Sequence, residues 1–245
     1  MKLRKAFRYV RQRTNLNSFA YVRSRTQRVA GVCALLVLSG CASTAVAHGT
    51  PGLVTIQTAV TCPAPPAHTA VTNPPRTFTS APKLAVPKDI GYCAFIDTAA
   101  GVISIRLRPE YAPHAVSDVV SLAQQGFYDG LSFYQACPAI SGPPCPDTAP
   151  VALAGDPTNT GTGGPGYSVA SDPVVGEYLF GAVAMYGSSA SRIGSQFLIS
   201  KGDSSSLARK YDIFGQVTDG FGALAAVQKG TPIIWIAIVM TAPEP

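Results

Sequence analysis

The sequence predicts a mainly β domain, built as an antiparallel barrel, over residues 90–245. Three observations predict it: many short runs with strand-like character, glycine-rich turns between them, and only two helical patches. Alternating β–α–β units would require a helix after nearly every strand, so a parallel α/β sheet is disfavoured. A barrel of short antiparallel strands is therefore the expected architecture.

The first clear element is a strand in which Ile103, Ile105 and Leu107 share one face, the pattern of a half-buried strand. A helix then begins at Pro113, a residue that suits the first helical turn, and it stops near Gly126. The remaining elements alternate with turns up to the end of the chain. We expect strands at 102–107, 131–136, 151–154, 179–185, 196–200, 213–217 and 233–240, and a second helix at 221–228.

The first forty residues have the layout of an export signal. Residues 1–29 hold nine basic residues and no acidic residue, and an apolar run of ten residues, 29–38, follows. This run is too short to cross a membrane as a helix, which needs about 20 residues, but it fits a signal peptide. It ends in Leu38-Ser39-Gly40-Cys41, which resembles the bacterial lipobox. We therefore predict a signal peptide over 1–40 and a lipid on Cys41, which would anchor the protein to the extracytoplasmic face of the cell membrane.

Removal of this leader would change the charge of the protein. The whole chain carries +6, but the part after the leader has ten basic against thirteen acidic side chains, a net charge of −3. A nucleic-acid partner is therefore not expected. Two alternatives stay open: a basic arm kept on the mature protein, and ordinary secretion without a lipid.

Residues 41–89 are rich in Pro, Thr and Ala and contain few large apolar side chains after Val60. Such a segment buries too little apolar surface to offset the entropy of ordering it. We therefore expect a flexible tether between the membrane and the domain at 90–245.

Four cysteines remain after the leader and the lipid site: Cys62, Cys93, Cys137 and Cys145. They allow three pairings. We favour Cys62–Cys93, which would join the tether to the first strand, and Cys137–Cys145, which would close a loop rich in Pro and Gly. No Cys-x-x-Cys spacing occurs, so a zinc site is disfavoured, and we expect neither a metal nor a cofactor.

The run Gly161-x-Gly163-x-x-Gly166 has the letters of a dinucleotide-binding pattern. That pattern requires a helix directly after the glycines, because the phosphate lies at the helix N-terminus. Here Pro165 lies inside the run, and the residues after it show no helical period. An irregular loop is the preferred interpretation.

Two segments carry a more specific pattern: Gly155-Asp156-Pro157 followed by 161–167, and Gly194-Ser195-Gln196-Phe197 about thirty residues later. Both resemble signature segments of the cyclophilins, a family of prolyl isomerases. The resemblance covers about 95–239 and implies an eight-stranded closed antiparallel β-barrel capped by two α-helices. It also implies no cofactor, binding of proline-containing segments, and a monomer. Further matching segments occur in the family's order at 109–113, 126–130, 182–185 and 214–217.

Cyclophilins catalyse rotation about the bond before proline, whose barrier of ~18–20 kcal/mol comes from amide resonance. The family directs an arginine side chain at the twisted amide. The matching segment here is Phe133-Tyr134-Gln135, so the resemblance places Gln135 at the arginine position. We expect weak activity, because a neutral amide donates a hydrogen bond without the assistance of a charge.

The resemblance also implies a set of substrate-binding residues, several of which differ from the family's usual ones. Together they are expected to present an apolar hollow for the proline ring. Three alternatives stay open: Gln135 as a solvent-facing strand residue, Tyr186 as a plug in the neighbouring groove, and Arg192 as either a solvated loop charge or a displaced catalytic donor. The substrate-binding set is Val151, Leu153, Tyr186, Arg192, Gln196, Leu198, Leu207 and Tyr211.

Two main functions follow from these patterns. The first is an exported prolyl isomerase that assists the folding of extracytoplasmic proteins with weak activity. The second is a non-catalytic cyclophilin-like binding or chaperone module of the cell envelope. A purely structural envelope lipoprotein is a third and weaker hypothesis.

Overall fold

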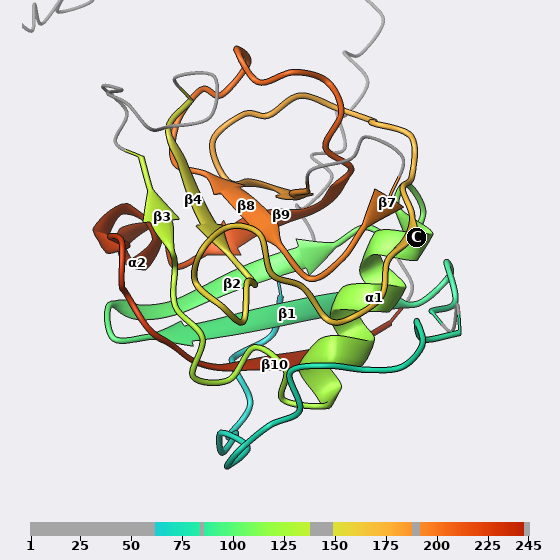
Figure 1. Cartoon of the computed structure of the whole chain (residues 1–245). Helices are drawn as coiled ribbons and strands as arrows, with labels where there is room; N and C mark the ends of the chain where they lie inside the picture. The colour runs from blue at the N-terminus through green and yellow to red at the C-terminus, as the bar shows by residue number, and fades with distance from the viewer. Residues whose placement is uncertain (1–61, 84–85, 138–148, 188–191, 243–245) are drawn as a thin grey trace, which may run out of the picture. The chain divides into compact units, whose positions relative to one another are not determined.

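The protein, described by a computed structural model, contains a curled eight-stranded antiparallel sheet (Figure 1). The structure describes residues 62–83, 86–137, 149–187 and 192–242, without the side chain of Arg192. The strand order is β10-β1-β2-β9-β6-β8-β4-β3. Its strands are β1 Gly91–Thr98, β2 Gly101–Leu107, β3 Gln135–Ala136, β4 Val151–Ala154, β6 Ala182–Met185, β8 Phe197–Ser200, β9 Ile213–Asp219 and β10 Ile233–Thr241. A separate two-stranded sheet pairs β5 Val169–Ala170 with β7 Arg192–Ile193.

The two edges of the large sheet meet and close it into a barrel. The segments that lead into β3 and β10 run antiparallel and form a bridge between Ser132 and Pro232. Beside this bridge, the amide of Ile233 donates a hydrogen bond to the Leu131 carbonyl over 2.7 Å. Closure pairs the backbone groups that an open sheet would leave exposed along its edges. The mainly β, eight-stranded closed barrel predicted from the sequence is therefore confirmed.

Two helices accompany the barrel, also as predicted. The longer one, α1 (Pro113–Gln124), packs against β10 and buries a face that includes Val116 and Val119. The shorter one, α2 (Phe221–Ala226), follows β9 and contacts β2. It ends before the predicted residue 228, because Val227 leaves the helical conformation (φ −58°, ψ 127°).

Several strands differ from the sequence-based prediction. The strand β1 is absent from the expected set, and the strand expected over 179–185 begins only at Ala182. The strand expected over 131–136 contributes only the two residues of β3, although the bridge at Ser132 continues the same edge. The strands β5 and β7 were not predicted, because two residues are too few to show a period.

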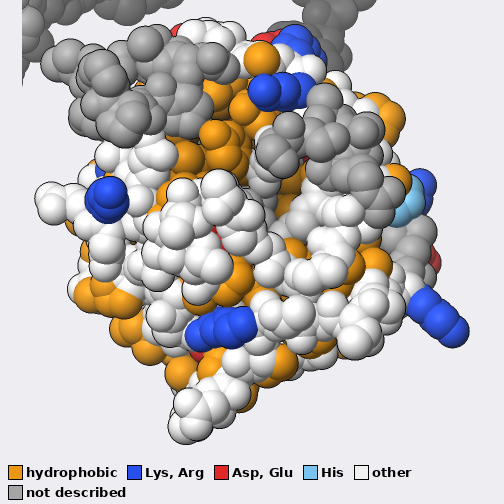
Figure 2. Space-filling model, in the orientation of Figure 1, with side chains coloured by type: hydrophobic (Ala, Val, Ile, Leu, Met, Phe, Trp, Pro, Cys, Tyr) orange, Lys and Arg blue, Asp and Glu red, His pale blue; other side chains and the backbone are white. Residues whose placement is uncertain are grey.

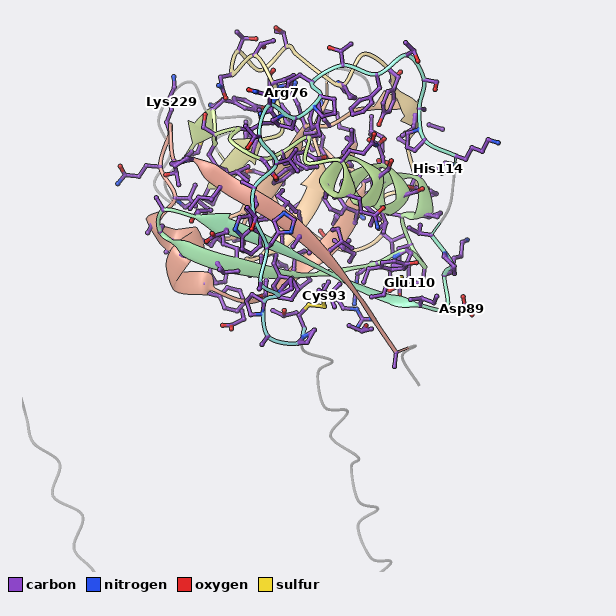
Figure 3. All side chains as sticks on the ribbon, turned by 90° about the horizontal axis from the view of Figure 1, so that it is seen from below. Arg76, Asp89, Cys93, Glu110, His114 and Lys229 are labelled. Carbon is purple, nitrogen blue, oxygen red and sulfur yellow. A yellow bond between two sulfur atoms is a disulfide. The ribbon has the colours of Figure 1, made fainter. Side chains whose placement is uncertain are left out.

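The segment Cys62–Lys83, called the strap below, lies on the barrel without regular secondary structure (the cyan chain in Figure 1). The predicted disulfide between Cys62 and Cys93 is present and joins the start of the strap to β1 (Figure 3). Cys93 itself is 1% exposed. The strap is therefore attached to the barrel core at its first residue.

Hydrogen bonds hold the middle of the strap. The amide of Val71 donates to the Asp129 carboxylate over 2.9 Å, and the Arg76 guanidinium donates to the carbonyls of Phe127 and Asp129. The expectation of free, flexible chain is therefore wrong for residues 62–83. The physical reason is that a disulfide and buried polar partners, neither visible in the segment's own composition, offset its ordering entropy.

Several predictions concern residues that the structure does not describe. The signal peptide over 1–40, the lipid site Cys41 and the pairing of Cys137 with Cys145 fall in this class and stay predictions. The domain boundaries at residues 40 and 89 also stay predictions. Among the described residues, no helix combines the length and the apolar character needed to cross a membrane.

Candidate functional site

The register of the sheet places Gln135 at the end of a row of side chains that crosses five strands. Gln135 pairs with Leu153, Leu153 with Leu198, Leu198 with Ala184, and Ala184 with Ile213. Directly paired residues of antiparallel strands point to the same face of a sheet. The predicted catalytic position and two predicted substrate-binding residues therefore share one face of the barrel.

This face carries an apolar cluster that is separate from the main core. The ring of Tyr186 lies against that of Tyr211, with the centroids 5.2 Å apart and the planes at 30°. Figure 2 shows hydrophobic side chains gathered at the surface near the β4–β8 end of the sheet. The structure thus brings six of the eight predicted substrate-binding residues together in one cluster. Those buried in the cluster are Val151, Leu153, Leu198, Leu207 and Tyr211, each less than a tenth exposed, with Tyr186 packed beside them.

Gln135 is partly buried and neutral. Its Nε2 lies 3.7 Å from Cys137 Sγ, and a cysteine sulfur is a weak acceptor. The Gln135 amide can donate a hydrogen bond to a ligand, but it carries no charge. The side chain of Arg192, the alternative charged donor, lies outside the described part of the chain, and its backbone belongs to β7.

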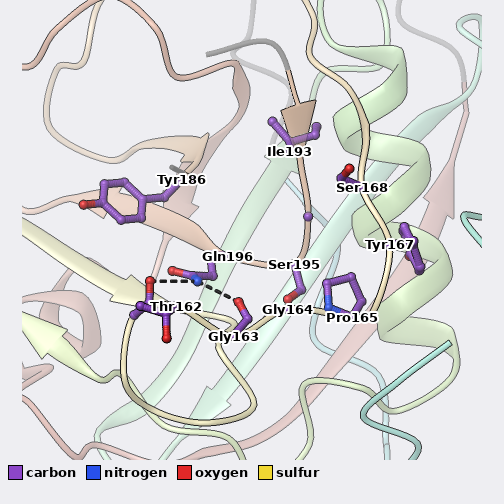
Figure 4. Close-up of a pocket in the computed structure, with 13 residues that line it drawn as sticks. Thr162, Gly163, Gly164, Pro165, Tyr167, Ser168, Tyr186, Ile193, Ser195 and Gln196 are labelled. Carbon is purple, nitrogen blue, oxygen red and sulfur yellow. Dashed lines mark hydrogen bonds between the residues drawn. The ribbon is translucent and has the colours of Figure 1, made fainter. Parts of the chain in front are cut away.

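A groove of about 440 Å³ lies beside this cluster (Figure 4). The loop 161–168 forms one wall, and Tyr186, Gly187 and residues 193–196 form the other. Tyr186 belongs to both the cluster and the groove. Tyr186 therefore joins the apolar cluster to the groove.

Gln196 fixes the floor of this groove through both ends of its amide. Its Oε1 accepts a hydrogen bond from the Tyr134 hydroxyl over 2.6 Å. Its Nε2 donates to the carbonyls of Gly161 (3.2 Å) and Gly163 (2.8 Å) (dashed in Figure 4). Burial raises the pKa of the Tyr134 hydroxyl, so this group remains a donor at all ordinary pH values.

The glycine-rich loop is folded around the carboxylate of Asp156. This carboxylate accepts hydrogen bonds from the amides of Thr158 (2.7 Å), Thr160 (3.0 Å) and Gly163 (3.2 Å). Burial acts to raise the pKa of the Asp156 carboxyl, but these and neighbouring hydrogen bonds outweigh it and hold the pKa below its ordinary value. Asp156 is therefore an ionised structural anchor for the loop rather than a proton donor.

Gly155 explains why the loop turns sharply at this point. Its φ is +88°, and a Cβ there would collide with the Ser195 carbonyl oxygen. The Ser195 hydroxyl in turn donates to the Gly155 carbonyl over 2.6 Å. The segments Gly155-Asp156 and Ser195-Gln196, far apart in the sequence, thus lie in contact under the groove.

Sequence reasoning missed two parts of the site. Tyr134 was identified only as the neighbour of Gln135, although it orients Gln196. The loop 161–166 was correctly predicted to be irregular, but its role as a groove wall was not seen. The dinucleotide pattern in it is followed by the short strand β5 rather than a helix. The described residues contain no group of three or more His, Cys, Asp or Glu side chains that could hold a metal ion.

A comparison with protein families decides the classification. The sequence profile described as "Cyclophilin type peptidyl-prolyl cis-trans isomerase/CLD" matches residues 94–236. The chain belongs to the cyclophilin family. Prolyl cis–trans isomerisation is the activity by which this family is named, and the matched range contains both the row and the groove.

Individual proteins are also similar to this chain. A peptidyl-prolyl cis-trans isomerase of Synechococcus elongatus is 30% identical over 151 residues, which cover 61% of this chain and 97% of that protein. Peptidyl-prolyl cis-trans isomerase B of Bacillus subtilis is 35% identical over 120 residues, which cover 48% of this chain and 77% of that protein. A crystal structure of a cyclophilin-type isomerase from Cryptosporidium parvum aligns with 24% identity and a TM-score of 0.48, covering 63% of this chain and 99% of that one.

Proposed function

We propose that this protein binds proline-containing segments of unfolded exported proteins and isomerises them slowly. The proline ring lies at the edge of the apolar cluster, against the partly exposed Tyr186, and the adjoining residues of the peptide enter the groove. The family membership supports the reaction type, and the continuity of cluster and groove supports the mode of binding.

The proposed slow rate rests on one observation: the side chain of Gln135, at the end of the row, is neutral. Twisting the prolyl amide localises an electron pair on its nitrogen, and a hydrogen bond to this nitrogen stabilises the twisted state. A charged donor makes such a bond roughly twice as strong as a neutral donor does. By analogy with the removal of one preorganised donor, the substitution costs about 10²–10³-fold in rate.

The export part of the proposal rests on three features. The basic leader, the apolar run and Leu38-Ser39-Gly40-Cys41 occur in the order of a lipoprotein signal. The disulfide between Cys62 and Cys93 fits an oxidising compartment, where such bonds persist. The clients would then be chains that fold outside the cytoplasm.

A protease-coupled isomerisation assay on the purified full chain tests the proposal, with succinyl-Ala-Ala-Pro-Phe-4-nitroanilide as the probe. We expect a low kcat/KM for the unmodified protein and a rise of about 10²-fold for Gln135→Arg. The same substitution at the exposed residue Gln124, at the end of α1, is the matched control and leaves the rate unchanged.

Two other outcomes separate the alternatives. An unmodified rate equal to that of an ordinary cyclophilin would refute the idea of a weakened site. Binding of the probe without turnover, in the unmodified protein and in Gln135→Arg alike, would favour the non-catalytic binding or chaperone module. The packing of Tyr186 against Tyr211 is the observation that favours this second candidate, because it covers part of the apolar surface.

The lipid anchor has its own test. In cells that express the full chain, Cys41→Ala releases the protein from the membrane fraction, whereas Cys62→Ala does not. An unchanged membrane fraction for Cys41→Ala would contradict the proposed lipidation.

A further inference from the structure

The outer wall of the groove touches the strap. Pro165 and Tyr167 line the groove, and the amide of Phe78 in the strap donates a hydrogen bond to the Pro165 carbonyl over 2.8 Å. The Phe78 ring lies edge-on to that of Tyr167 at a centroid distance of 6.3 Å. It also packs against Phe127, a fully buried residue of the main core, at 6.2 Å. Phe78 therefore connects the barrel core to the wall.

The approach of strap and wall is close enough to require glycine. Gly166 has φ +89°, and a Cβ on it would lie 2.8 Å from both the Phe78 carbonyl oxygen and Thr77 Cγ2. The wall and the strap thus meet backbone to backbone at this residue. A shift of the strap at Phe78 must either move the wall or break this contact.

Tyr167 receives a second constraint from α1. Its hydroxyl donates to Asp118 Oδ1 over 2.7 Å. Its ring is therefore held between the strap and the helix. The inner side of the loop is fixed by Gln196 and Asp156, as described above, so Phe78 and Asp118 define the position of the outer side.

The strap lies outside the part of the chain that matches the family profile, residues 94–236. Its position depends on the disulfide between Cys62 and Cys93 and on the hydrogen bonds of Val71 and Arg76, all of them away from the groove. The chain thus adds to the barrel a segment that is anchored independently and reaches the groove through one aromatic residue.

We propose that Phe78 is a positioning residue for the groove: it holds the Pro165–Tyr167 wall in the geometry that receives the peptide. The peptide part of this inference rests on the proposed function. Without the Phe78 ring the wall loses its aromatic packing against the strap and keeps only the backbone contacts and the bond to Asp118. The peptide must then supply part of the ordering of the wall, which lowers affinity without changing the groups that act on the prolyl bond. Strap docking and peptide binding are then coupled, and the coupling is reciprocal.

Peptide binding to the full chain tests this. Phe78→Ala is expected to raise the Kd and the KM for succinyl-Ala-Ala-Pro-Phe-4-nitroanilide about five- to tenfold, within the range of ordinary coupling, with kcat unchanged. Phe78→Leu, which refills the apolar site, is expected to stay within about twofold of the unmodified protein. His68→Ala is the control, because His68 lies in the same strap but contacts Trp235 and not the wall. Equal increases in KM for His68→Ala and Phe78→Ala, or a fall in kcat alone, would overturn the proposal.

Amide hydrogen exchange gives a readout that needs no turnover. Bound peptide is expected to slow exchange of the Phe78 amide through undocking of the strap, by the same factor by which strap docking strengthens peptide binding. If the probe does not bind at all, the proposed function is refuted. Amide exchange in the free protein still tests whether Phe78 positions the wall. Phe78→Ala, and not His68→Ala, is then expected to speed exchange in β5, which follows the wall. Unchanged exchange in β5 would refute the positioning role.

Discussion

The groove around Gln196 and the strand face that carries Gln135 lie side by side on one barrel, and each contains a glutamine near the proposed peptide path. Gln196 is 8% exposed, and both ends of its amide are bonded to named partners in the protein. Gln135 is partly exposed on the two-residue strand β3. It occupies the position at which the resemblance to the cyclophilins implies an arginine. The same type of side chain thus fixes the groove loop in one region, and in the other it is the neutral residue on which the proposed slow rate rests.

This difference separates binding from chemistry. The groove is preorganised, because its polar groups are bonded within the protein before any ligand arrives. In the row of Gln135, Leu153 and Leu198 the two leucines are buried, and the one polar side chain, Gln135, carries no charge. A protein built in this way is expected to retain affinity for a proline segment while the reaction step is slow. This contrast can be tested by substitution.

The largest effect concerns the anchor of the groove wall at Asp118. Burial raises the pKa of the Asp118 carboxyl to about 7, although the hydrogen bond from Tyr167 opposes this. Between pH 4 and 7 the unfolded carboxyl loses its proton while the folded one keeps it, so the free energy of unfolding falls as the pH rises and levels off above 7. At about 1.36 kcal/mol per pKa unit, this loss reaches on the order of 4 kcal/mol.

Asp118→Asn is expected to remove this loss and to be more stable than the unmodified protein at pH 8. Urea unfolding at a series of pH values measures it. The exposed Asp89→Asn is the control, and the raised pKa of Asp212 contributes equally to both curves. Parallel pH profiles for Asp118→Asn and the unmodified protein would contradict the prediction.

Gln196→Leu comes next. It leaves the Tyr134 hydroxyl and the carbonyls of Gly161 and Gly163 without their partner. An unsatisfied buried polar group costs about 1–3 kcal/mol, so we expect a loss of about 3 kcal/mol in the free energy of unfolding. Peptide affinity is expected to fall as well, because the groove floor is no longer fixed. The control is Gln216→Leu on β9, and equal losses for the two variants would refute the special role of Gln196.

Tyr134→Phe removes only one of these bonds. The expected loss is about 1–2 kcal/mol in denaturant unfolding, since one buried acceptor loses its donor. In the double variant with Gln196→Leu, the two losses are expected to be clearly non-additive, because both report on the same network. Strict additivity would show that the Tyr134 hydroxyl does not act through Gln196. The exposed Tyr111→Phe is the control.

The smallest effect is expected at Gln135→Leu. The side chain is neutral and partly exposed, so its loss should change the free energy of unfolding by no more than about 0.5 kcal/mol. The isomerisation rate is expected to stay within about threefold of the unmodified protein, in contrast to the large gain from Gln135→Arg. A fall of a hundredfold would mean that the Gln135 amide already acts as an effective donor.

Several features were predictable because they depend on local patterns. The alternation of Ile103, Ile105 and Leu107 predicted β2, and Pro113 predicted the start of α1. The glycine-rich segments indicated the family and, through it, the closed barrel. The contact between Tyr134 and Gln196 was not predictable in this way. The two residues are 62 positions apart, and neither segment contains a pattern that indicates the other.

The fold family and the neutral residue at position 135 can be read from the sequence alone, since short stretches of chain carry both. The docking of the Pro-rich residues 62–83 on the barrel and the contact of Phe78 with the groove wall depend on tertiary contacts. The composition of residues 62–83 predicted a flexible segment, because composition shows only how much apolar surface a segment can bury among its own residues. Its order comes from partners such as Cys93 and Asp129, which the chain brings near only when the barrel has closed.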